Sequence, residues 1–232
     1  MNFSKRSYTK ELLDADNIPF ADIERNMKEI DTINRLLGGH DITLQGFKKL
    51  ISNQKKISVC EIGCGNGNNL KALLAYCKKN SIDISITGID IKKECIDAAM
   101  QDASFPANTK WLVSDYAEVM FDEKPDIIFS SLFCHHFTDG DLIKQFYWMH
   151  ENCATGFFIN DLQRHPLAYY SIKFLTKIFS SSYLVKNDAP LSVARGFIKN
   201  EWIQLLEQAG IKNYSVQWKW AFRYLVCCKK CG

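Results

Sequence analysis

Residues 57–67 read Ile-Ser-Val-Cys-Glu-Ile-Gly-Cys-Gly-Asn-Gly, and this stretch decides the fold. The apolar run from Ile57 to Cys60 predicts a buried strand, and the closely spaced glycines after it predict a tight turn that opens a helix near Asn68. A glycine-rich turn between a strand and a helix can hold a nucleotide-like ligand, because the helix N-terminus faces that ligand. The stretch therefore predicts an α/β domain with a ligand site at the end of its first strand.

Short apolar runs alternate with helical patterns from residue 57 onward, as in a parallel sheet with helices on both faces. The predicted strands are 57–62, 84–89, 110–113, 126–131, 156–160, 213–218 and 221–228. The predicted helices between them are 67–79, 92–102, 139–151 and 199–209. The connection near Lys219 is too short for a crossover helix, so the last two strands must form an antiparallel hairpin. We expect a Rossmann-like α/β fold with a seven-stranded, mostly parallel sheet.

Two segments lie outside this alternation. Residues 1–53 predict helices and no strand, and we interpret them as an N-terminal helical extension of a domain that spans residues 54–232. Residues 162–198 are too many for an ordinary connection, and they contain an amphipathic helix. We expect this insertion to form a lid over the carboxyl ends of the strands, where ligands bind in open α/β sheets.

Composition excludes several classes of function. The net charge of +3 is small and scattered, which argues against a nucleic-acid partner. No stretch approaches the roughly 20 apolar residues that span a bilayer, although the amphipathic insertion leaves peripheral lipid contact open. Nine irregularly spaced cysteines, without an apolar signal core, predict free thiols and a cytoplasmic location. We expect a monomer or a homodimer. The terminal Cys227, Cys228 and Cys231 contain one C-x-x-C without a second pair nearby, so we expect no metal.

Acidic residues at the ends of successive predicted strands indicate the ligand. Glu61 stands two places before the first glycine, where it would repel a pyrophosphate and attract an ammonium group. Asp90 ends the second strand and could accept both ribose hydroxyls with Ile91 against the adenine, or it could cap the next helix. Asp115 ends the third strand and suits an adenine amino group, or it is an ordinary loop aspartate. S-adenosyl-L-methionine carries an ammonium and a sulfonium but no phosphate, and it is the predicted cofactor.

The predicted cofactor site extends from the glycine turn to the end of the fourth strand. Its residues are Glu61, Gly63, Cys64, Gly65, Gly67, Asn69, Asp90, Ile91, Asp115, Tyr116, Ser131 and Leu132.

With its acids and glycines in this order, the sequence resembles the class I S-adenosylmethionine-dependent methyltransferases over about residues 55–161. In that family the acids of the glycine turn and of the second and third strands have the roles given above to Glu61, Asp90 and Asp115. The stretch 130–137, Ser-Ser-Leu-Phe-Cys-His-His-Phe, looks like the branch that methylates small molecules in quinone and natural-product biosynthesis. The resemblance implies methyl transfer to a small molecule, with S-adenosyl-L-homocysteine as the product.

Candidate catalytic residues follow the fourth and fifth strands. His135 and His136 lie where the methyl group should be, and an imidazole with a pKa of about 6.5 suits removal of a proton from an acceptor. Asp161 could orient one of these rings, accept the proton itself, or cap the helix that begins at Pro166. Alternatively, one histidine caps or packs against the helix near Asp139 while the other is exposed.

Four further residues are predicted to bind the acceptor: Arg164, His165, Tyr169 and Arg195. Arg195 could instead pair with an acid such as Glu201. His40 and His150 are expected to lie away from the site.

The sequence therefore predicts O-methylation of a small, partly apolar acceptor such as a phenol or quinol. Methylation of an activated carbon and a non-catalytic cofactor-binding protein are the alternatives. A NAD-dependent oxidoreductase would need a G-x-G-x-x-G spacing and no acid before the glycines. The absence of an Asn/Asp-Pro-Pro-Tyr motif after the fourth strand also disfavours methylation of nucleic-acid amino groups.

Overall fold

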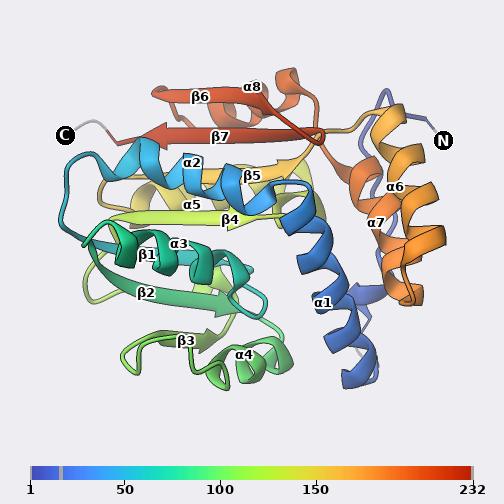
Figure 1. Cartoon of the computed structure of the whole chain (residues 1–232). Helices are drawn as coiled ribbons and strands as arrows, with labels where there is room; N and C mark the ends of the chain where they lie inside the picture. The colour runs from blue at the N-terminus through green and yellow to red at the C-terminus, as the bar shows by residue number, and fades with distance from the viewer. Residues whose placement is uncertain (1, 16–17, 231–232) are drawn as a thin grey trace.

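The structure is a computed structural model that describes residues 2–15 and 18–230 (Figure 1). The strands are β1 (Lys56–Ile62), β2 (Asp83–Asp90), β3 (Lys110–Val113), β4 (Ile127–Ser131), β5 (Gly156–Leu162), β6 (Tyr214–Lys219) and β7 (Arg223–Lys229). The α-helices are α1 (Phe20–Leu36), α2 (Gly39–Ile51), α3 (Asn68–Lys79), α4 (Lys93–Met100), α5 (Asp139–Asn152), α6 (Pro166–Phe179), α7 (Tyr183–Arg195) and α8 (Lys199–Gln208). Short 3₁₀ turns are η1 (Leu12–Asp14), η2 (Tyr116–Glu118) and η3 (Cys134–His136). Cys231, part of the terminal C-x-x-C, lies outside the described residues.

The seven strands form one sheet in the order β3-β2-β1-β4-β5-β7-β6. Strands β1 to β5 run parallel, whereas β7 pairs antiparallel with both β5 and β6. Three residues join β6 to β7, and two of them, Ala221 and Phe222, have positive φ angles of 57° and 56°. Left-handed turn residues match the twist of a hairpin, which explains the tight reversal. The predicted mostly parallel sheet with an antiparallel C-terminal hairpin is confirmed.

Hydrophobic side chains fill both faces of the sheet. On one face Phe146 of α5 and Trp202 of α8 are fully buried, and on the other face Phe47 of α2 is fully buried beside Leu70 of α3. Helix α2 lies directly along the sheet over β5 (Figure 1). The boundary predicted near residue 53 therefore separates two chain segments but does not separate two hydrophobic cores.

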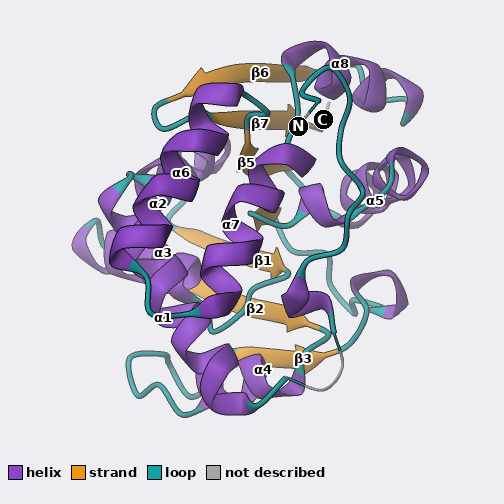
Figure 2. Ribbon diagram, turned by 90° about the vertical axis from the view of Figure 1, so that its right-hand side faces the viewer, coloured by secondary structure: helices purple, strands orange, loops and turns teal. Residues whose placement is uncertain are grey.

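The insertion contains two helices rather than the single amphipathic helix that the sequence predicted. Helices α6 and α7 stand with α1 beyond the carboxyl ends of β1 to β5 (Figures 1 and 2). The aromatic side chains of Tyr170, Phe174 and Phe179 on α6 are exposed, so they do not form a buried core of the insertion. The interior position belongs to α7, which packs against η1 and η3. Sequence periodicity missed α7 because it is buried on several sides and contains Pro190.

Within residues 2–15 and 18–230, no helix combines the length and the apolar character that crossing a membrane requires.

The contact between α2 and β5 yields a prediction about stability. Replacing an interior helical glycine with alanine normally stabilises a helix by about 1 kcal/mol. At Gly46, however, a new Cβ would lie 2.4 Å from the ring of Phe158, which is stacked on Phe129. We expect Gly46→Ala to lower the free energy of unfolding by about 1–3 kcal/mol in urea denaturation, because overpacking outweighs helix propensity.

Gly140→Ala is the matched control, because a Cβ at this helical glycine of α5 would meet no atom within 4 Å. It should leave stability unchanged or raise it slightly. Equal stability changes in the two variants would contradict the proposed steric limit between α2 and β5.

Candidate active site

The carboxylate of Glu61 lies at the carboxyl end of β1 and is completely buried. Its Oε1 accepts a hydrogen bond of 2.9 Å from the Asn69 amide, but Oε2 has no hydrogen-bond partner among the described residues. Burial raises the pKa of Glu61 well above its ordinary value of 4.5. An unpaired buried carboxylate is costly, and an ammonium group is the ligand that would relieve this cost.

The glycine turn is closely packed at its first and last glycines and open at the middle one. Gly63, Gly65 and Gly67 all have positive φ angles, of 65°, 54° and 80°. A Cβ at Gly63 would collide with Phe133, and one at Gly67 would come within 2.8 Å of Trp111. At Gly65 the same Cβ would meet no atom within 4 Å, so a ligand can approach the backbone there.

Asp90 holds the turn from the neighbouring strand. One carboxylate oxygen accepts the Gly65 amide at 2.8 Å, and the other accepts the Lys92 amide at 2.9 Å. Asp90 does not cap α4, whose N-cap is Lys92, and each Asp90 oxygen still has a lone pair for a ribose hydroxyl. Ile91 beside it is 71% exposed, which leaves its side chain available to a flat ring.

Asp115 and Tyr116 follow β3. The Asp115 side chain is exposed and accepts the Ala117 amide at 3.0 Å, which caps η2. The ring of Tyr116 packs edge-on against Phe133 and Trp148. The predicted contacts of Asp115 and Tyr116 with the adenine remain predictions.

The remaining predicted cofactor residues differ in what they expose. The Cys64 side chain is buried, with its sulfur close to Gly88, so only the backbone of Cys64 can face a ligand. Ser131 Oγ accepts a 3.4 Å hydrogen bond from Asn160. Leu132 has a φ of 53°, which is unusual for a bulky residue, and its amide donates to the Asn160 carbonyl at 2.9 Å. Strained backbone of this kind is common at ligand sites.

His40 has a supporting role beside the predicted cofactor residues, because it contacts the side chain of Asn69. Its Nδ1 lies 2.9 Å from Oδ1 of Asn69, and its Nε2 lies 3.0 Å from Asp31. These contacts orient the amide that donates to Glu61. His150, at the far end of α5, contacts only Glu151 among the described hydrogen-bond partners.

His135 and Asp161 form a buried pair at the ends of β4 and β5. Nδ1 of His135 donates to Asp161 at 2.8 Å, and the carboxylate also accepts the amides of Phe133 and Leu162. Burial alone would raise the pKa of Asp161, but the positive charge and the hydrogen bond of His135 lower it below its usual value. The carboxylate therefore stays ionised and fixes the orientation of the imidazole.

Asp161 does not cap α6, because His165 occupies that position. Nδ1 of His165 accepts the Leu167 amide at 3.2 Å. Tyr169, one turn into the helix, packs edge-on against Phe3. Contact of His165 and Tyr169 with an acceptor remains a prediction.

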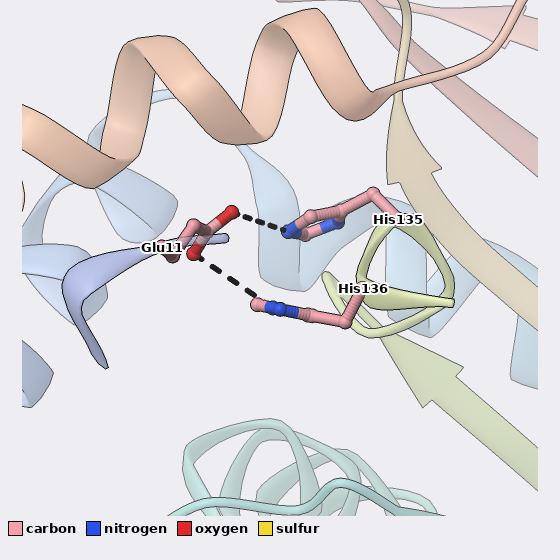
Figure 3. A group of neighbouring side chains, drawn as sticks. All are labelled: Glu11, His135 and His136. Carbon is pink, nitrogen blue, oxygen red and sulfur yellow. Dashed lines mark ion pairs between the residues drawn. The ribbon is translucent and has the colours of Figure 1, made fainter. Parts of the chain in front are cut away.

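Two acids of the N-terminal segment that no sequence pattern predicted, Glu11 (Figure 3) and Asp14, lie beside the histidine pair. Oε1 of Glu11 lies 3.7 Å from Nε2 of His135, and Oε2 lies 4.0 Å from Nε2 of His136. Oδ1 of Asp14 lies 3.4 Å from Nδ1 of His136. Burial raises the pKa of Glu11, although His136 and nearby donors oppose this effect.

Helix α7 fixes Glu11 in place. The Asp188 carboxylate accepts the amides of Leu12 and Leu13 at 2.8 and 2.9 Å, and the Ser192 hydroxyl donates to Glu11 at 2.7 Å. All these contacts join residues about 180 positions apart. No local pattern could have shown this pairing.

The two arginines that were predicted to bind the acceptor form hydrogen bonds and ion pairs within the protein. Arg164 makes a bidentate pair with Glu201 and also donates to the carbonyls of Gly196 and Phe3. Arg195 does not pair with Glu201. Its guanidinium is buried and donates to the carbonyls that follow β4 and to the N-terminal segment. Their contacts give no support to a role in holding the acceptor.

The unpaired oxygen of Glu61 yields a second prediction. Glu61→Gln removes the buried charge, so we expect a higher melting temperature and a weaker calorimetric affinity for S-adenosyl-L-methionine. Because folding raises the pKa of Glu61, the wild-type penalty is absent below about pH 4.5 and grows as the pH rises above that value. The stability gain of the variant should follow the same course.

Asp83→Asn is the control, because this exposed acid begins β2 at the opposite edge of the sheet. A Glu61→Gln variant that is less stable at neutral pH and binds the cofactor normally would contradict the assigned role.

Comparison with known families identifies a domain within the chain. Residues 59–168 match the model of a methyltransferase domain. A search of curated proteins found no match.

Several solved structures share the fold. The plantazolicin methyltransferase BpumL, in complex with a triazolic desmethylPZN analogue and SAH, has 17% identity and a TM-score of 0.67, with 91% of each chain covered. Human N-acetylserotonin methyltransferase in complex with SAM has 19% identity and a TM-score of 0.60. The match covers 89% of this chain but only 54% of the human chain, so this chain spans about half the length of that relative.

Magnesium protoporphyrin IX methyltransferase (ChlM) from Synechocystis PCC 6803, with bound SAH, has 12% identity and a TM-score of 0.55 over 94% of this chain and 90% of that one. At these identities the structural neighbours establish only a shared fold. Residues 59–168 therefore form a methyltransferase domain, and the sheet order and the acid-flanked glycine turn are similar to those of the class I S-adenosylmethionine-dependent methyltransferases.

Proposed function

We propose that the protein methylates an oxygen of a small, partly apolar acceptor such as a phenol or quinol. The observation that carries this proposal is the buried His135–Asp161 pair, which lies at the same edge of the sheet as Glu61 and Gly65. A hydroxyl acceptor must lose a proton before or during transfer, and this pair is suited to activating it.

The tautomer of His135 supports this role. Because Asp161 accepts the hydrogen on Nδ1, the neutral ring has its lone pair on Nε2. A phenol has a pKa of about 10, so modest help from a neighbouring group suffices. We assign His135, His136 and Asp161 to activation of the acceptor.

The residues of the cofactor half fit S-adenosyl-L-methionine. When bound, this cofactor supplies a methyl group that its sulfonium makes electrophilic. The unpaired oxygen of Glu61 would accept its ammonium group, and Asp90 would accept ribose hydroxyls while it holds the Gly65 amide. The open tip at Gly65 lets the backbone come close to the cofactor. These residues hold the methyl donor in line with the acceptor, which is the main requirement of the reaction.

The proposed acceptor class is supported by the names of the solved relatives, which refer to N-acetylserotonin, plantazolicin and magnesium protoporphyrin IX. A cytoplasmic location is part of the proposal and is supported by the eight described cysteines, which are free and buried.

The double variant His135→Ala/His136→Ala tests the proposal. It should bind S-adenosyl-L-methionine with nearly wild-type affinity but lose at least about 100-fold in turnover, because general catalysis of this kind typically contributes that much. Turnover is measured as release of S-adenosyl-L-homocysteine with a panel of phenols and quinols. Calorimetric cofactor binding also checks that the variant is folded.

His150→Ala is the control, because this histidine lies at the far end of α5. Wild-type turnover by the double variant would refute the assignment of the histidines. Products methylated at carbon would replace O-methylation with the alternative chemistry, and cofactor binding without turnover on any acceptor would favour a cofactor-binding protein.

A further inference from the structure

Glu11, His135 and His136 present three ligand atoms to a common point, and these atoms lie within 4.8 Å of one another (Figure 3). The side chains of Glu11 and His135 are each 4% exposed. The distances of 3.7 and 4.0 Å between the carboxylate and the two Nε2 atoms are too long for hydrogen bonds. Oε1 of Glu11 accepts the Ser192 hydroxyl at 2.7 Å, whereas Nε2 of His135 and Nε2 of His136 have no hydrogen-bond partner among the described residues, so a bridging atom between these groups would satisfy both nitrogens.

The spacing is close to that of ligands around a metal ion. Two ligand atoms at about 2.0–2.2 Å from a tetrahedral ion lie roughly 3.4 Å apart. The distances from the Glu11 carboxylate to the two Nε2 atoms exceed this separation by 0.3 and 0.6 Å, and all three ligand atoms lie within 4.8 Å, so side-chain adjustments of about an ångström would complete the site. Two histidines and one glutamate are also a donor set that zinc uses in catalytic sites, where a fourth position stays open.

Both imidazoles have a carboxylate on the nitrogen that faces away from Glu11. Asp161 lies 2.8 Å from Nδ1 of His135, and Asp14 lies 3.4 Å from Nδ1 of His136. Histidines that bind metals nearly always donate their other ring nitrogen in this way, which leaves Nε2 free as the ligand. The hydroxyl of Ser192 in turn orients the Glu11 carboxylate at 2.7 Å.

The neighbouring cations do not neutralise Glu11. Arg6 makes its ion pair with Asp139 and donates to main-chain carbonyls. Arg195 pairs with Asp14 at 3.4 Å and otherwise donates to carbonyls. The cluster therefore offers a carboxylate oxygen together with two imidazole nitrogens, a donor set suited to a divalent transition-metal ion.

We propose that Glu11, His135 and His136 bind a divalent transition-metal ion of the Zn²⁺ type and leave one coordination position for the acceptor oxygen. Binding of the ion stands on the geometry, whereas its role in the reaction rests on the proposed function. There the ion lowers the pKa of the acceptor hydroxyl, so His135 acts on the acceptor through the ion. The hydroxyl proton leaves to solvent, the oxygen bonds to the methyl carbon, and the carbon–sulfur bond breaks to release S-adenosyl-L-homocysteine.

Metal binding to the full chain tests the proposal, with Zn²⁺ and Co²⁺ as probes. Equilibrium dialysis and elemental analysis should find one ion per chain. Glu11→Gln and His136→Ala should each weaken binding by at least about tenfold, since even supporting residues of metal sites contribute that much. Glu24→Gln and His150→Ala, which alter exposed residues of α1 and α5, are the matched controls and should bind like the wild type. Calorimetric binding of S-adenosyl-L-methionine confirms that each variant is folded.

The visible spectrum of the Co²⁺ form separates this site from the cysteines. Nitrogen and oxygen ligands give no thiolate-to-cobalt charge-transfer band. The proposal is overturned by such a band, by wild-type binding in Glu11→Gln, or by less than a tenth of an ion per chain. Full turnover after chelation would remove the metal from the reaction and leave the proposed methyl transfer standing. Metal binding by the cluster without any methyl transfer would refute the proposed function alone.

Discussion

The carboxylate of Asp161 connects the end of β5 to the loop that follows β4. It accepts hydrogen bonds from Nδ1 and from the backbone amide of His135. Because the carboxylate is buried away from water, these donors are needed to stabilise its charge. A buried charge held in this way fixes the short turn η3 and therefore the directions of both histidines. The rest of the acceptor half is arranged around η3. Arg195 donates hydrogen bonds to the carbonyls of this turn, and Glu11 of the N-terminal segment lies beside its histidine rings.

The two halves of the site solve different physical problems. The cofactor half contains two features that cost folding free energy. Glu61 is buried with one unpaired carboxylate oxygen, and Leu132 has a strained backbone. Such features persist because the surrounding sheet and helices determine the backbone at these points. In the acceptor half the buried charges of Asp161 and Arg195 are instead hydrogen-bonded internally, and the Nε2 atoms of His135 and His136 remain open to a ligand. Affinity is thus expected from the first half and orientation from the second.

The sequence was sufficient to predict the sheet, its hairpin and the acids at the ends of β1 to β3, because strand periodicity and turn residues are local signals. It was also sufficient to place His135 and Asp161 at one edge, since parallel strands end together. It did not show that His40 supports Asn69, or that Glu11 faces the histidines. Those contacts depend on how helices pack across the chain, and α7 in particular lacks a clear periodic pattern.

The hydrogen bonds between Glu11 and α7 also have a consequence for the order in which the two halves of the site fold. The turn at Gly65 and its partner Asp90 are 25 positions apart, so that half can assemble early at a small cost in loop-closure entropy. Glu11 cannot form its hydrogen bond with Ser192 until that residue, 181 positions later in the chain, has been synthesised. A nascent chain should therefore acquire the ability to hold its methyl donor well before it can use it.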